Sequence, residues 1–183
     1  IRTEGGGLNL IWVRDNGHGI HAEDLPLAVE RHATSKVATA QDLMRVSSLG
    51  FRGEALASVA SVARVKVTSA TLEMQTGWQI EVHGAQQINH QPAAHPVGTT
   101  VEVSDLFYNT PARRKFLKSE RVETQHIDQV IRRLSLAHMD VGFTLTQSRE
   151  ANSATRAKKS LHLVANDIPA RLGTVLSDDF VQH

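Results

Sequence analysis

Apolar and polar side chains alternate along several short stretches of the chain, and this period of two is typical of β-strands. The run at 8–14 has apolar residues on both faces, which indicates an interior strand. In 78–82 the alternation places Trp78, Ile80 and Val82 on the inward face. Further strands are predicted at 1–4, 64–68, 98–103 and 141–145, and the polar stretch 86–96 is expected to be irregular.

Apolar residues three and four positions apart predict helices at 23–32, 54–62 and 121–138. The last of these is expected to bury a face formed by Ile127, Val130, Ile131 and Leu134. A capping box at 39–42 predicts a short helix that ends near residue 46. Another helix is predicted to start at Pro111, because Asn109 and Thr110 precede it and proline suits the first helical position.

The composition adds few constraints. The chain has 183 residues, with 40% hydrophobic and 21% charged, which is ordinary for a globular protein. A net charge of +1 gives no global field toward nucleic acid or membrane, so any basic surface must be local. The absence of cysteine excludes disulfides and thiolate chemistry. No apolar run reaches the roughly 20 residues of a membrane helix, and no signal peptide is visible; the chain starts at Ile1, which we interpret as a fragment.

Asp15 follows the predicted strand at 8–14 directly. An aspartate at the end of a buried strand is costly unless it is hydrogen-bonded, and the exocyclic amino group of adenine is one suitable donor. Gly17 and Gly19 would let a flat ring approach the backbone. An ordinary Asp-Asn-Gly turn explains the same residues equally well, so this segment alone does not decide between them.

A glycine-rich loop, Gly50-Phe51-Arg52-Gly53, precedes the helix predicted from residue 54. Free backbone N–H groups at a helix start suit an anion, and the Arg52 guanidinium suits phosphate oxygens. Thr34, Ser35 and Lys36 follow another predicted helix and are also candidates for phosphate contact. The alternatives are a surface loop that needs glycine for positive φ, and a solvated loop.

Two clusters have competing explanations. Arg113, Arg114, Lys115 and Lys118 form a local basic segment, which either contacts DNA phosphates or is a solvated helix face. His18 and His21 are three positions apart, but a glycine between them and the lack of a second ligand pair argue against a metal site, so we predict none.

Five motifs together are specific: Asp15-Asn16-Gly17-x-Gly19-Ile20, the run 31–36, the run 50–56, Gly98-Thr99-Thr100 and the run 107–116. In this order they closely resemble the N-terminal ATPase region of MutL-type DNA mismatch repair proteins, which are members of the GHKL superfamily. The resemblance covers nearly the whole chain, and it is loosest at 71–91 and after 147. A type II topoisomerase ATPase would share the Asp15 motif but not the 107–116 segment.

The resemblance implies an α+β fold: a two-layer sandwich of the GHKL (Bergerat) type, with a mixed, mostly antiparallel sheet and helices on one face. It places a GHKL-type ATP-binding domain at 1–150, and a linker with the start of a transducer-like second domain at 151–183. It also implies a cytoplasmic bacterial protein associated with the nucleoid.

The resemblance also assigns roles to residues. Asp15 would accept the adenine amino hydrogen, Gly17 and Gly19 would shape the base pocket, and Thr99 would support Asp15 through water. A lid over the phosphates would be formed by Thr34, Ser35, Lys36, Gly50, Phe51, Arg52, Gly53, Glu54, Ala55 and Leu56. The implied ligands and partners are ATP, Mg²⁺, DNA, a second copy of the protein, a mismatch sensor and a downstream nuclease or helicase.

The family has a further motif, expected before Ile1, with the catalytic glutamate and the magnesium-binding asparagine. We therefore expect an ATPase in the parent protein, no catalytic residue in this chain, and negligible ATP hydrolysis by this chain alone. Two alternatives remain: a nucleotide-gated interaction module without turnover, and a simple DNA-binding domain that uses the basic segment.

Overall fold

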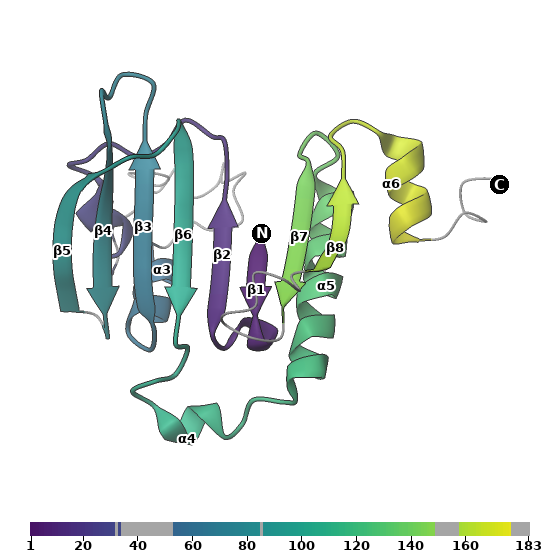
Figure 1. Cartoon of the computed structure of the whole chain (residues 1–183), viewed down its shortest axis with the longest axis horizontal. Helices are drawn as coiled ribbons and strands as arrows, with labels where there is room; N and C mark the ends of the chain where they lie inside the picture. The colour runs from purple at the N-terminus through teal and green to yellow at the C-terminus, as the bar shows by residue number, and fades with distance from the viewer. Residues whose placement is uncertain (32, 34–52, 85, 149–157, 177–183) are drawn as a thin grey trace, which may run out of the picture. The chain divides into compact units, whose positions relative to one another are not determined.

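The computed structural model describes residues 1–31, 33, 53–84, 86–148 and 158–176 (Figure 1). The chain divides into two compact units. The first unit combines residues 1–11 with 116–183, and the second unit is the continuous stretch 12–115.

The second unit is built on an antiparallel sheet with the strand order β5-β4-β3-β6-β2 (Figure 1). β2 starts in the first unit and enters the second at Trp12. The register places Ser69 on β3 opposite Thr99 on one side and Trp78 on the other. The strands are β2 (Leu10–Arg14), β3 (Arg64–Ala70), β4 (Gly77–His83), β5 (Gln86–Ala93) and β6 (Gly98–Ser104).

The core of the second unit lies between this sheet and two short helices. Alternate residues of β3 and β4 are buried because one face of each strand packs under the helices: Val65, Val67, Ile80 and Val82. Helix α3 (Ala55–Ala60) contacts β3, and α1 (Leu25–Ala28) contacts β4 (Figure 1). The small side chains of α3 allow a close approach, and the side chain of Leu25 on α1 is fully buried.

The first unit has its own strands and helices. β1 (Arg2–Glu4) pairs in parallel with β7 (Phe143–Ser148), and β8 (Lys158–Leu163) pairs antiparallel with β7. A single 3-10 turn, η1 (Gly5–Gly7), follows β1. The longest helix, α5 (Glu120–Ala137), packs on β7. The core cluster consists of Ile131, Leu145, Leu161 and Leu163.

A buried arginine completes the first unit. Arg171 lies on α6 (Ile168–Val175) and is 1% exposed. Its Nη1 donates to the carbonyls of Ser135 and His138, at 2.9 and 2.8 Å. Its Nη2 donates to the carbonyls of Val141 and Val164, at 2.7 and 2.6 Å. Since the last carbonyls of a helix lack intrahelical partners and carry partial negative charge, the guanidinium stabilises the C-terminal end of α5.

The predicted α+β class with mixed, mostly antiparallel pairing is confirmed, as are the strands that alternation predicted. The prediction of irregular structure at 86–96 is wrong, because β5 forms there by backbone pairing with β4. Val130 is 51% exposed, so its assignment to the buried face of α5 is also wrong. The helix predicted at 23–32 is only the single turn of α1 among the described residues.

Two further expectations have a different outcome. The helix predicted from the capping box at 39–42 lies outside the described residues. The domain boundary at 150/151 also falls in a stretch outside them and stays a prediction.

In the described part of the chain, no helix has both the length and the apolar character needed to cross a bilayer.

Candidate functional site

Asp15 and Thr99 are joined by two hydrogen bonds in opposite directions. The Asp15 N–H donates to the Thr99 carbonyl at 2.9 Å, and the Thr99 N–H donates to Asp15 Oδ1 at 3.1 Å. The N–H of Gly17 donates to the same carboxylate oxygen at 2.9 Å. Within the described residues, Asp15 Oδ2 has no hydrogen-bond partner, and the side chain is exposed. The carboxylate is therefore fixed by one oxygen and offers the other to a ligand that donates.

Ser69 connects this pair to the neighbouring strand and loop. Its side chain is fully buried, and its Oγ accepts the N–H of Ile20 at 2.8 Å. The same hydroxyl donates to the Gly98 carbonyl at 2.9 Å and lies 2.9 Å from Thr99 Oγ1. No motif in the sequence points to Ser69. The available signal was a polar residue at the inward position that follows Val65 and Val67 in the alternation of β3.

Two glycines are required by the backbone around Asp15. Gly19 has φ +79°, and a Cβ there would lie 2.1 Å from the Ala70 carbonyl oxygen. Gly98 has φ +121°, and a Cβ there would lie 2.3 Å from the Asp15 carbonyl oxygen. Gly17 is different, because its φ is not in the left-handed region. A Cβ added there would lie 3.1 Å from Asp15 Oδ1, which is a side-chain atom. The positive φ and the nearby Ala70 backbone therefore require glycine at position 19 whether or not a ligand binds there.

The predicted lid is only partly described. Thr34, Ser35, Lys36, Gly50, Phe51 and Arg52 lie outside the described residues. Gly53 is described: it has φ +63°, and a Cβ there would lie 2.1 Å from the Ala33 carbonyl oxygen. Glu54 precedes α3, and its carbonyl accepts the N–H of Ser58 at 2.8 Å. Ala55 and Leu56 form the first turn of α3. Ala33 and Gly53 are therefore close neighbours on either side of residues 34–52.

The basic segment is divided between the two units. Arg113, Arg114 and Lys115 are exposed in the second unit, on and directly after helix α4 (Pro111–Arg114). Lys118 is exposed in the first unit, so the structure does not place it relative to the other three. Proline is in the first turn of α4 as predicted, but the Thr110 side chain makes no capping hydrogen bond.

The loop before α4 is held firmly in the second unit. The Phe107 N–H donates to the Val62 carbonyl at 2.7 Å, and Asn109 Nδ2 donates to the Ser61 carbonyl at 2.9 Å. Asp105 and Phe107 have φ values of 52° and 64°, which side chains other than glycine rarely adopt. These contacts fix the start of α4 against the end of α3, and so they position Arg113 and Arg114.

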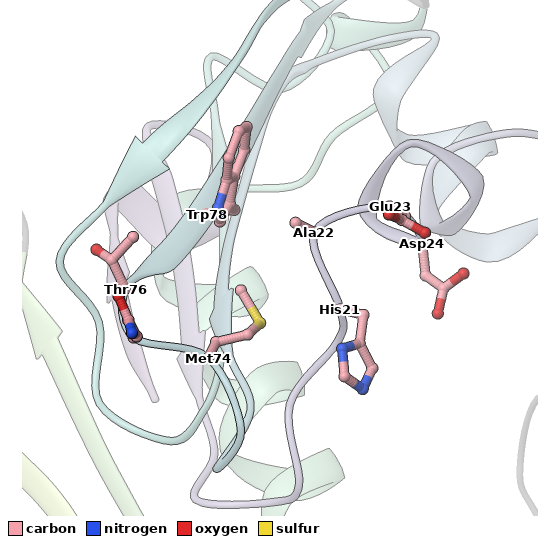
Figure 2. Close-up of a pocket in the computed structure, with 8 residues that line it drawn as sticks. His21, Ala22, Glu23, Asp24, Met74, Thr76 and Trp78 are labelled. Atoms are coloured by element: carbon pink, nitrogen blue, oxygen red, sulfur yellow. The ribbon is translucent and has the colours of Figure 1, made fainter.

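An open pocket of about 500 Å³ lies elsewhere in the second unit (Figure 2). Figure 2 shows the stretch 21–24 on one side and Met74, Thr76 and Trp78 on the other. It contains none of the predicted site residues; it is lined by His21, Ala22, Glu23, Asp24, Met74, Gln75, Thr76 and Trp78. No three His, Asp or Glu side chains come together as a metal site in the described part of the chain.

Comparison with known proteins identifies the family. No family model matches the chain. The DNA mismatch repair protein MutL of Pseudomonas entomophila is 51% identical over 186 residues, which are 100% of this chain and 28% of that protein. MutL of Pseudomonas putida is 60% identical over 146 residues, which are 79% of this chain and 23% of that protein. The chain belongs to the MutL family. It spans less than a third of the length of these MutL relatives.

Solved structures agree with this assignment to the MutL family. The ATPase domain of Aquifex aeolicus MutL complexed with ADP has a TM-score of 0.71 at 32% identity, and the match covers 95% of this chain and 58% of that one. The N-terminal domain of a DNA repair protein has a TM-score of 0.76 at 25% identity, with 96% and 50% covered. The expected N-terminal GHKL ATPase region of MutL, with its α+β sandwich, is therefore confirmed.

Proposed function

We propose that this MutL-family chain forms part of an ATP-binding site in which Asp15 recognises the adenine base. The observation that carries the proposal is the Asp15 carboxylate, whose Oδ1 is held by two backbone N–H groups while Oδ2 has no partner among the described residues. An oriented acceptor of this kind suits the adenine amino group, because no reorganisation is needed when the ligand arrives. The ADP complex of the Aquifex aeolicus MutL ATPase domain supports the choice of nucleotide.

Thr99 is proposed to complete the base site. The family resemblance implies that Thr99 supports Asp15 through water, whereas the structure has a direct bond from the Thr99 N–H to the carboxylate. The phosphates are proposed to lie under a lid that includes Lys36 and Arg52, as the family resemblance implies. The described residues do not provide a Mg²⁺ site of their own. The magnesium ligand and the catalytic glutamate are proposed to belong to the motif expected before Ile1.

The proposed biological role is that of the family. ATP binding would order the lid and bring two N-terminal regions together, and this dimer would couple mismatch recognition to later repair steps. For this chain alone, a nucleotide-gated interaction module without turnover is the alternative.

Contact with DNA is a second proposed activity. The side chains of Arg113, Arg114 and Lys115 are exposed close together on and directly after α4, and the loop that leads into α4 is fixed by hydrogen bonds to the Val62 and Ser61 carbonyls. A fixed group of cations suits the phosphate backbone of DNA, and binding of this kind weakens steeply with salt.

The test of the nucleotide proposal is calorimetric titration of the full-length protein with ADP and with a non-hydrolysable ATP analogue. Asp15→Ala removes the proposed acceptor, so binding should be abolished. Asp24→Ala is the control, because Asp24 is also exposed in the second unit and its side chain makes no capping bond to α1. If Asp15→Ala binds ADP as tightly as the Asp24→Ala control, the assignment of adenine to Asp15 is wrong.

A further inference from the structure

The position of one proton in the second unit follows from the contacts of Ser69. A serine hydroxyl has a single proton and two acceptor lone pairs. Ser69 Oγ lies 2.9 Å from the Gly98 carbonyl oxygen and 2.9 Å from Thr99 Oγ1. A carbonyl oxygen only accepts, so the bond to Gly98 must use the Ser69 proton. That proton is then not available for Thr99.

The hydrogen bond between the two hydroxyls must therefore use the Thr99 proton. Thr99 Oγ1 donates to Ser69 Oγ, and the Ile20 N–H donates to the same oxygen at 2.8 Å. These two donors fill both acceptor positions of Ser69, and its side chain is fully buried, so water does not compete. With its proton directed at Ser69, the Thr99 hydroxyl presents only lone pairs to any ligand beside Asp15.

We infer that Ser69 is a positioning residue that fixes Thr99 as a hydrogen-bond acceptor and thereby selects a base edge with an amino group over one with a carbonyl. The inference rests on the proposed adenine site. The Asp15 carboxylate also only accepts, and the Thr99 N–H holds it beside Thr99 at 3.1 Å. A carbonyl oxygen that meets both of these acceptors is repelled. Without Ser69, the Thr99 hydroxyl is free to rotate and to donate to such an oxygen.

Inosine diphosphate provides the probe, because its base has a carbonyl in place of the adenine amino group and an N1–H donor in place of the adenine N1 acceptor. The full-length protein is titrated with ADP and with inosine diphosphate, and the selectivity ratio is measured as the Kd of inosine diphosphate divided by the Kd of ADP. Ser69→Ala should lower this ratio roughly tenfold, which is the scale of one hydrogen bond. Ser69→Thr keeps the hydroxyl and should keep the ratio. Ser135→Ala is the matched control, since Ser135 is fully buried in the first unit and donates to the Arg132 carbonyl.

A second variant separates selectivity from a loss of structure. Ser69 is inferred to act through Thr99, so Thr99→Val should lower the ratio by a similar factor, and adding Ser69→Ala should then change it no further. The inference is overturned if Ser69→Ala binds ADP and its ratio of the Kd values for inosine diphosphate and ADP equals that of the wild type. If Ser69→Ala does not fold, a wild-type ratio in Thr99→Val overturns it instead. A wild-type protein that binds neither nucleotide overturns the proposed function, and this inference with it.

Discussion

The guanidinium of Arg171 and the carbonyl of Ser135 form a buried hydrogen bond of 2.9 Å between α6 and α5. Three more carbonyls, those of His138, Val141 and Val164, accept from the same side chain. No carboxylate takes part in these four bonds, so the positive charge is stabilised by main-chain dipoles. The end of α5, the loop before β7, the residue after β8 and α6 are thus held by a single side chain.

Arg171→Lys should destabilise the first unit by about 3 kcal/mol, because an ammonium group has three donors and lacks the planar fork that reaches four carbonyls. The measurement is urea unfolding, followed by hydrogen exchange of the α5 amides. Arg133→Lys on the exposed side of α5 is the control and should have little effect. Equal midpoints for the two variants would contradict the role assigned to Arg171.

Asp15→Asn should separate ligand recognition from local structure. The amide oxygen of asparagine can still accept the N–H groups of Thr99 and Gly17, so thermal stability should change little. Its NH₂ group replaces the free carboxylate oxygen and faces the adenine amino group, donor against donor. ADP affinity in calorimetry should therefore fall at least about tenfold. An unchanged affinity would mean that the adenine amino group does not bind at Asp15.

Gly19→Ala should destabilise the second unit by roughly 2–4 kcal/mol, because the new Cβ would meet the Ala70 carbonyl oxygen at 2.1 Å and φ is +79°. Gly17→Ala is the matched comparison and should cost less, since its Cβ would meet only the end of the Asp15 side chain at 3.1 Å. Fluorescence of Trp12 and Trp78 during urea unfolding reports on this unit. An equal loss in both variants would be evidence against the steric argument.

Reversing two charges tests the DNA proposal. Arg113→Glu combined with Arg114→Glu should weaken DNA binding. The slope of log K against log salt is negative, and it should become less steep by about 2, one for each lost phosphate contact. Arg121→Glu combined with Arg133→Glu gives the same change in net charge at exposed positions of α5. Fluorescence anisotropy over a range of salt concentrations provides the measurement. If both pairs lower DNA affinity equally, only net charge matters and α4 is not the binding surface.

The strongly alternating strands could be predicted from sequence because burial on one face imposes a period of two. The outward positions of β3 and β4 are polar, and their inward positions hold Val65, Val67, Ile80 and Val82. β5 could not be predicted in this way. Its residues are mostly exposed, and its strand conformation comes from backbone pairing with β4, which leaves no apolar pattern.

The candidate site was predicted in part for similar reasons. Asp15 and Thr99 can be selected from the sequence because each lies in a recognisable motif, and the structure joins them by two hydrogen bonds. Ser69 was not found, because its importance comes from three contacts with residues distant in sequence, Ile20, Gly98 and Thr99. Hydrogen-bond networks of this kind depend on the register between strands, which alternation alone does not determine.

The division of the chain into units affects the order in which the protein can fold during synthesis. The second unit is one continuous stretch, so all of its strands from Trp12 onward have left the ribosome once the chain has emerged to Lys115. The first unit is interrupted, because Arg2 on β1 pairs with Thr146 on β7. The edge of β1 that pairs with β7 stays unpaired until β7 has been made, whereas its other edge neighbours β2, which follows it directly in the chain. A chaperone that binds nascent chains would therefore find this edge of β1 accessible for longer than the strand edges that become paired inside the second unit.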